Sequence, residues 1–169
     1  MFIKFKSGNK KPGNKKPAGF TIVELILTVA LMVAIVLISV LSLGGRKGQT
    51  ELDGITKQIV SQLREAQSKS VSQINGTTWG MRFDNATSSA YFGTYSSSTY
   101  ATTTKISYTR LPRNIRYTTT TLPVGSYREI TFSQLSGTPS TTTVVSLQLT
   151  DSPNVSTTIT IGGGGVISY

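Results

Sequence analysis

Carboxylates are the only side chains in this sequence suited to acid–base chemistry near neutral pH. The 169-residue chain has no histidine and no cysteine, which removes the commonest general base, the thiolate nucleophile and the zinc–thiolate site. No serine-nucleophile motif and no metal-ligand spacing occurs. The acids beyond the first 43 residues are scattered and supply no close pair on one predicted strand: Glu51, Asp53, Glu65, Asp84, Glu129 and Asp151. We therefore expect no enzyme activity, no cofactor and no metal site.

Three arginines, Arg110, Arg113 and Arg116, recur at every third position beside Tyr108 and Tyr117. Arginines that contact phosphates and tyrosines that stack on bases would form a nucleic-acid contact. The alternative is a solvated loop whose charges only maintain solubility. Six of the 17 basic residues lie in the first 19 positions. The rest of the chain has 11 basic and 7 acidic residues, which gives it a net charge of +4. This modest charge favours the solvated loop.

Glu24 is the only charged residue between positions 20 and 43, and Leu25–Leu43 is a run of 19 residues without any charge. As a helix, positions 20–43 would extend roughly 36 Å, which is enough to cross a bilayer of about 30 Å. An ionised carboxylate in such a segment is costly and usually has a partner. The basic, glycine- and proline-containing residues 1–19 cannot bury enough apolar surface to fold.

Three interpretations of the first 43 residues compete. A secretory signal peptide fits the basic start, but its apolar core would be only about 7–15 residues long. A plain membrane anchor, with the lysines in the cytoplasm, explains the hydrophobicity and leaves Glu24 unexplained. The third interpretation accounts for Glu24 and rests on the run Lys15-Lys16-Pro17-Ala18-Gly19-Phe20-Thr21-Ile22-Val23-Glu24-Leu25.

This run resembles the cleavage signal of type IV prepilins and pseudopilins. The resemblance implies that a prepilin peptidase cuts between Gly19 and Phe20 and methylates the new amino terminus. It also implies that Glu24 pairs with the amino terminus of a neighbouring subunit during assembly. Without that role, Glu24 would be an interfacial residue that reaches toward lipid head groups.

The remainder of the chain divides into an amphipathic helix at about 49–75 and a β-rich part at 76–169. Apolar residues at intervals of three and four indicate one apolar stripe along the helix, with a gap at Ser70. The stripe consists of Leu52, Ile55, Ile59, Leu63, Ala66 and Ile74, and Val60 and Val71 widen it. Gly44 and Gly45 precede it, as a break or as a soft spot in one long helix. Strands are predicted at Thr78–Phe83, Ala90–Tyr95, Lys105–Arg110, Ile115–Tyr117, Tyr127–Phe132, Val144–Leu149, Val155–Ile161 and Val166–Tyr169.

The order of apolar helix, amphipathic helix and strands also resembles the pilin plan, which is an α+β fold. In that plan one long N-terminal helix, membrane half and amphipathic half, packs on an antiparallel sheet. Four segments are similar to the H-type minor pseudopilins of type II secretion and the FimT-like minor pilins: Leu63–Ser70, Trp79–Asp84, Leu111–Ile115 and the strands from Ile130 to Val166. The disulfide loop of many pilins is absent, because the chain has no cysteine.

The sequence thus predicts a precursor with a cleaved leader at 1–19, a transmembrane and assembly helix at 20–45 and a periplasmic or extracellular domain at 46–169. The resemblance implies a structural subunit of a type IV pilus-like or type II secretion filament. Its expected partners are other pilins, a prepilin peptidase, an inner-membrane assembly platform and, before assembly, membrane lipid. The alternatives are a DNA-binding minor pilin for natural transformation and a plain membrane-anchored binding domain.

Overall fold

The computed structural model describes residues 19–169, apart from the side chains of residues 39–46. Most of the predicted leader, residues 1–18, therefore lies outside the described part of the chain. The chain divides into two compact units, residues 1–42 and 43–169. Helix α1 (Ile22–Val71) includes Gly44 and Gly45, so the helical assignment is not interrupted at these two glycines.

In the first unit, the described residues from Ile22 onward are helical and exposed. No helix is both long and apolar enough to cross a membrane, over the part of the chain that the structure describes. The predicted membrane segment at 20–43 includes residues 39–43, whose side chains lie outside the described part of the chain.

In the second unit, α1 buries the predicted stripe from Leu52 to Ala66, with Ile55 partly buried, whereas Val71 is 41% exposed. Ile59 and Leu63 are fully buried, and Leu52, Val60 and Ala66 are at most 2% exposed. The prediction that the stripe continues to position 74 is wrong. The helix ends at Val71, Gln73 adopts a left-handed conformation (φ 52°), and the 3₁₀ turn η1 (Ile74–Gly76) leaves Ile74 42% exposed.

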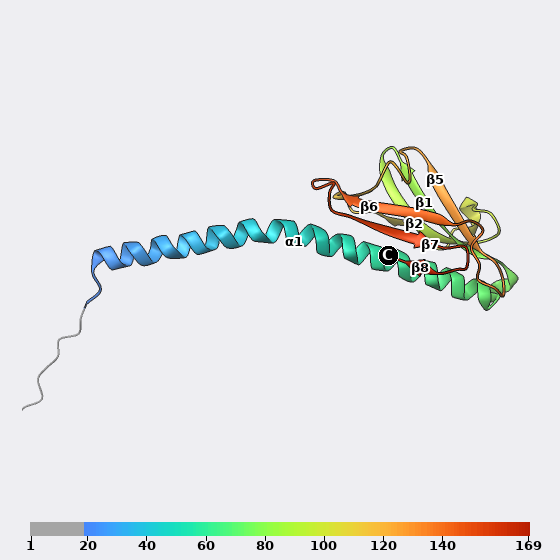
Figure 1. Cartoon of the computed structure of the whole chain (residues 1–169), viewed down its shortest axis with the longest axis horizontal. Helices are drawn as coiled ribbons and strands as arrows, with labels where there is room; N and C mark the ends of the chain where they lie inside the picture. Colours follow the sequence, from blue (N-terminus) through green and yellow to red (C-terminus); the bar gives the residue numbers. More distant parts are fainter. Residues whose placement is uncertain (1–18) are drawn as a thin grey trace, which may run out of the picture. The chain divides into compact units, whose positions relative to one another are not determined.

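The predicted strands all occur, most with shifted ends, and form two antiparallel four-stranded sheets (Figure 1). One has the order β3-β2-β1-β5 and the other the order β4-β6-β7-β8. The short turn η2 (Thr102–Thr104) lies between β2 and β3. The strand bounds are β1 (Trp79–Ala86), β2 (Ser89–Ser96), β3 (Thr109–Arg110), β4 (Ile115–Tyr117), β5 (Tyr127–Phe132), β6 (Thr143–Leu149), β7 (Ser156–Ile161) and β8 (Ile167–Ser168).

The expected antiparallel sheet is therefore two sheets, and the chain crosses between them from β3 to β4, back from β4 to β5, and again from β5 to β6. Leu111 lies in the connection between β3 and β4, and Ile115 is the first residue of β4. They are 4% and 3% exposed, so they anchor the chain in the core where it passes from the first sheet to the second. The predicted strand Lys105–Arg110 is shortened to Thr109–Arg110. The pairing with β2 continues irregularly before β3, because the backbone nitrogens of Ile106 (2.9 Å) and Ser107 (3.2 Å) both donate to the Thr94 carbonyl, and Tyr95 and Lys105 form an isolated bridge.

The C-terminal half of α1 and one face of each sheet enclose a single core. Trp79, Met81 and Phe83 lie on the buried face of β1, as their alternation predicts. In the second sheet, the buried faces carry aliphatic residues such as Leu147 and Ile159. Figure 1 shows β8 beside the C-terminal half of α1, where Gln67 Nε2 donates to the Gly165 carbonyl (2.8 Å). This is the predicted α+β arrangement.

Candidate functional site

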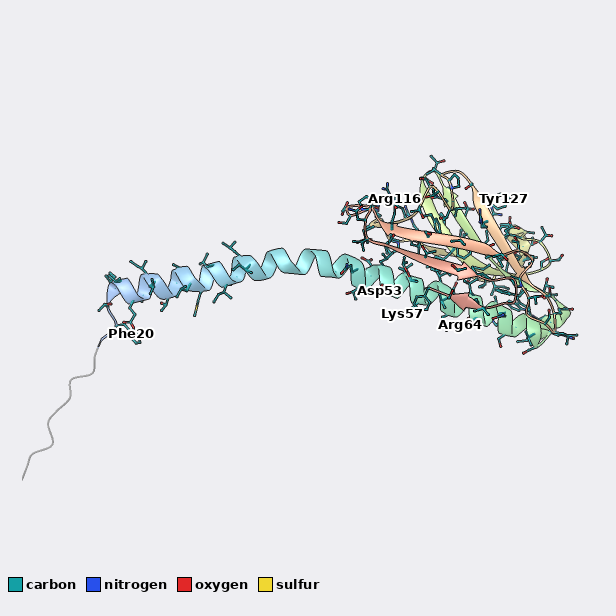
Figure 2. The ribbon with its side chains drawn as sticks, in the orientation of Figure 1. Phe20, Asp53, Lys57, Arg64, Arg116 and Tyr127 are labelled. Carbon is teal, nitrogen blue, oxygen red and sulfur yellow. The ribbon has the colours of Figure 1, made fainter. Side chains whose placement is uncertain are left out.

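The start of α1 holds the residues predicted to be processed and to direct assembly. Gly19 and Phe20 precede the helix, and Phe20, labelled in Figure 2, is 85% exposed. A Cβ atom added to Gly19 would meet nothing within 4 Å. The peptide bond between the two residues is thus outside regular structure, and no residue from 21 onward crowds Gly19.

Thr21 caps the helix. Its Oγ1 accepts a hydrogen bond from the backbone nitrogen of Glu24 (3.3 Å), and its carbonyl accepts one from the backbone nitrogen of Leu25 (3.2 Å). Glu24 is therefore at the third helical position, where a carboxylate is stabilised by the helix dipole. Sequence reasoning missed Thr21, although a Thr-x-x-Glu pattern before an apolar run is a known helix-start signature.

The Glu24 side chain is exposed and makes no hydrogen bond or ion pair with any other described residue. Apart from Thr21 and Thr28, its neighbours along the helix are mostly large apolar side chains. Their exposed fractions range from 53% to 78% in the helix: Ile22, Val23, Leu25, Ile26, Leu27, Val29, Leu31, Met32, Val33, Ile35, Val36, Leu37 and Ile38. A helix that is apolar all round requires a non-aqueous environment or a packed partner, and patches of this size mark interaction surfaces.

The three predicted arginines come together. Arg110, Arg113 and Arg116 are exposed and line one hollow of about 450 Å³. The two tyrosines that would stack on bases do not join them. Tyr117 is 1% exposed and donates its hydroxyl hydrogen to the carbonyl of Tyr91 (2.8 Å), while Tyr108 stacks on the Tyr91 ring with centroids 4.9 Å apart.

The stacking part of the nucleic-acid prediction is therefore wrong for Tyr117, whereas Tyr108 is half-buried and already stacks on Tyr91. Tyr117 is buried because side chains alternate between the two faces of β4, so that Ile115 and Tyr117 point into the core while Arg116 points out. Burial also raises the pKa of the Tyr117 hydroxyl well above its usual value, as expected of a phenol held inside the domain.

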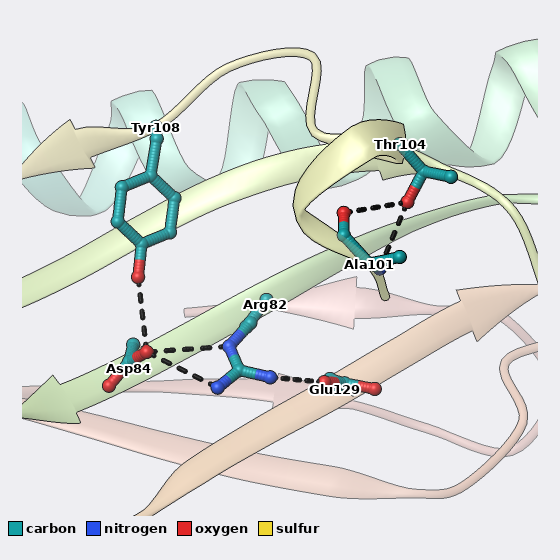
Figure 3. Close-up of polar contacts among 6 residues, drawn as sticks. All are labelled: Arg82, Asp84, Ala101, Thr104, Tyr108 and Glu129. Carbon is teal, nitrogen blue, oxygen red and sulfur yellow. Dashed lines mark hydrogen bonds and ion pairs between the residues drawn. The ribbon is translucent and has the colours of Figure 1, made fainter. Parts of the chain in front are cut away.

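A second charged cluster, which sequence reasoning missed, lies on the outer face of the first sheet (Figure 3). Arg82 Nη1 pairs with Glu129 Oε1 (2.5 Å) and Arg82 Nη2 with Asp84 Oδ2 (3.3 Å). The Arg82 guanidinium also lies over the rings of Tyr127 (3.7 Å) and Tyr100 (4.5 Å). Burial alone would lower the pKa of Arg82, but the hydrogen bonds to Glu129 and Asp84 outweigh it and raise that pKa.

This cluster fastens the loop of residues 97–108 onto the sheet. The Tyr108 hydroxyl donates to Asp84 Oδ2 (3.1 Å), and the loop backbone lies so close that a Cβ atom on Gly93 would be 2.1 Å from the Ser107 carbonyl oxygen. Burial, followed by the hydrogen bond to Asp84, raises the pKa of Tyr108 to about 12. Because every charge in the cluster is paired, we assign it a structural role. The opposite charges of Arg82 and Glu129 could have indicated this cluster, but only once the register between β1 and β5 was known.

A long N-terminal helix whose C-terminal half packs on antiparallel strands defines a pilin-like fold. The chain is similar to a solved structure, that of the minor pseudopilin EpsH from the type 2 secretion system of Vibrio cholerae, with a TM-score of 0.50 and 13% sequence identity. The match covers 70% of this chain and 94% of that one. No protein-family model and no curated protein sequence matches the chain.

Proposed function

We propose that this chain is a minor subunit of a type IV pilus-like or type II secretion filament, and that it acts in assembly and not in catalysis. The supporting observation is the apolar surface of residues 20–38, which is exposed along a helix and whose one charged residue is Glu24, with Thr21 and Thr28 as its uncharged polar residues. The pilin-like fold supports the same function, since α1 continues from this surface into the core of the β-rich unit.

The proposed precursor is cleaved between Gly19 and Phe20 and methylated on the new amino group. Cleavage would place a positive amine one turn before Glu24, at the end of the helix where Thr21 already provides the cap. In a filament, Glu24 would pair with the amine of a neighbouring subunit. An acid in an apolar interface would then be neutralised only when the two helices are in register, because any other register leaves it unpaired.

Before assembly, residues 20–45 would hold the protein in the inner membrane, with the N-terminus in the cytoplasm and the β-rich domain outside. Lipid would cover the apolar side chains that are exposed in the isolated chain. An inner-membrane assembly platform would then move the subunit into the filament. A prepilin peptidase and other pilins or pseudopilins complete the expected set of partners.

Co-expression with a prepilin peptidase, followed by intact-mass measurement of the membrane fraction, tests this function. The expected product begins at Phe20 and carries one added methyl group. A Gly19→Val variant serves as the control and should retain its leader, because a branched side chain would occupy the exposed position before the cut. If the wild-type chain keeps Met1 beside an active peptidase, the plain membrane anchor is the correct alternative.

A further inference from the structure

The hollow that Arg110, Arg113 and Arg116 line lies where the two sheets meet at their edges. β3 is an edge strand of the first sheet and β4 an edge strand of the second, and the segment between them carries Arg113. The turn between β1 and β2 forms the opposite wall, together with Val124. At about 450 Å³ the hollow is in the size range of ligand pockets, which is about 300–1,000 Å³.

Core residues between the arginines fix their outward direction. Leu111 and Ile115 are 4% and 3% exposed, whereas Arg110, Arg113 and Arg116 are exposed. The buried residues anchor the backbone on one side and leave the three guanidinium groups on the other. The spacing of three in the sequence thus becomes one charged rim in the fold.

Hydrogen bonds hold both walls of the hollow in place. The backbone nitrogen of Leu111 donates to the carbonyl of Ala90 (2.9 Å), which ties the arginine segment to β2. On the other wall, Asn85 Nδ2 donates to the carbonyl of Leu122 (2.8 Å), and the nitrogen of Gly125 donates to the carbonyl of Asn85 (2.6 Å). The backbone of the site is therefore already ordered, and binding has to order only the exposed arginine side chains.

The charge of the hollow is not neutralised from within. No acidic residue is among those that line it, and none of the three arginines makes an ion pair with another residue whose side chain the structure describes. The nearby Asp84 is already occupied by Arg82 and Tyr108. Arg116, labelled in Figure 2, is instead held by a neutral group, since the Gln148 amide oxygen, in the orientation that satisfies both side chains, accepts from its Nε (2.9 Å) and Nη2 (3.1 Å).

Besides the arginines, the lining combines uncharged polar residues of the turn between β1 and β2 with apolar ones. Leu111, Pro112 and Ile115 contribute to it, and Val124 is 60% exposed. A ligand that suits this surface combines anionic groups with apolar ones. Guanidinium groups bind planar carboxylates through paired hydrogen bonds, which adds geometric specificity to the charge attraction.

We propose that this hollow is a docking site for an acidic segment of a partner protein, in which carboxylates alternate with aliphatic side chains. The carboxylates bind Arg110, Arg113 and Arg116, and the aliphatic groups cover Val124 and Pro112. Charge complementarity selects an anionic partner. The lining contains no aromatic ring for a base to stack on, which favours a peptide over a nucleic acid.

Fluorescence anisotropy with the full chain in an uncharged detergent tests the proposal. The probe is a short labelled peptide of alternating glutamate and valine, compared with the same peptide in which glutamine replaces glutamate. A single-stranded and a duplex DNA oligonucleotide with the same label provide the other comparison. The glutamate peptide should bind more tightly than all three, and its affinity should fall as salt is added, because the contacts are exposed.

Substitutions locate the binding. Arg113→Gln should weaken binding of the glutamate peptide about fivefold, and Arg110→Gln with Arg113→Gln about twentyfold. Lys57→Gln removes one charge from the exposed face of α1 and should leave the affinity unchanged. Equal unfolding midpoints would show that the variants are folded.

Tighter binding of either DNA, or equal binding of the glutamate and glutamine peptides, would overturn the proposal. So would full affinity in the double arginine variant. The N-terminal segment is unchanged in these variants, so failure here does not bear on the proposed processing and assembly.

Discussion

The Oγ atom of Ser70 accepts a hydrogen bond from the backbone nitrogen of Trp79 at 2.6 Å, and both residues are buried. This contact joins the last turn of α1 to the first residue of β1. In the sequence, Ser70 interrupts the apolar stripe of the helix. In the structure, the Ser70 hydroxyl provides a hydrogen-bond acceptor for the Trp79 backbone nitrogen, which would otherwise be buried without a partner.

Ser70→Ala should therefore destabilise the domain by about 1–3 kcal/mol, since it leaves the Trp79 nitrogen buried and unpaired. Denaturant unfolding of the full chain in detergent, followed by Trp79 fluorescence, measures the loss. Ser61→Ala is the matched control, because Ser61 is exposed on the same helix and should change stability little. Equal stability of the two variants would contradict the role assigned to Ser70.

Alkaline pH should weaken the attachment of the loop at residues 97–108. The pKa of Tyr108 is raised from 10.0 to about 12 in the folded state, so its protonated form is the one that folding favours. The stabilisation is complete below pH 10 and is lost as the pH rises through about 12.

Spectrophotometric titration of tyrosinate should show that Tyr108→Phe removes one late-titrating group. This variant also loses the hydrogen bond to Asp84 and with it about 1 kcal/mol, because the site is only partly buried. Its stability should decline less steeply than that of the wild type between pH 10 and 12. An unchanged titration curve would mean that Tyr108 is not held as described.

Substitution of Glu24 should separate membrane insertion from assembly. We expect Glu24→Ala to remain in the membrane fraction and to fail to enter filaments, since the apolar helix is intact and the carboxylate is gone. Immunoblotting of sheared filaments against whole membranes measures both.

Thr21→Ala is the control for effects on the helix start. It removes the acceptor for the Glu24 nitrogen and should cost the helix about 1 kcal/mol, while leaving the carboxylate in place and assembly largely intact. Wild-type incorporation of Glu24→Ala would refute the assembly role of Glu24.

Two glycines should respond to alanine in opposite ways. Gly54 lies inside α1 with nothing within 4 Å of an added Cβ atom, so Gly54→Ala should stabilise the domain by about 0.5–1 kcal/mol. At Gly93 the same atom would be 2.1 Å from the Ser107 carbonyl oxygen, so Gly93→Ala must displace the loop and destabilise the domain. Thermal unfolding midpoints of the two variants give the comparison, and a decrease for both would contradict the packing at Gly54.

Local pattern was sufficient to predict most of the fold. The three- and four-residue spacing of Leu52, Ile59 and Leu63 predicts the buried face of α1, because a helix brings these positions to one side. Alternation at Trp79, Met81 and Phe83 predicts the buried face of β1 for the corresponding reason. These features depend on residues close in sequence.

The candidate sites divide in the same way. The start of α1, with Gly19, Phe20 and Glu24, lies within a few consecutive residues, so the sequence alone was enough to single it out. The arginine cluster was predicted only in part. The sequence showed the regular spacing of Arg110, Arg113 and Arg116, but it did not show that Tyr117 is buried in the core.

The sequence by itself determined the helix, the strands and the isolated acid, because hydrophobic periodicity and charge are local properties. The tertiary structure decided that there are two sheets, that Arg82 faces Glu129 across paired strands, and that three arginines face the turn between β1 and β2. Each of these relations joins residues far apart in the chain. Their register depends on which buried side chains fill one common core, and that packing is a property of the whole domain.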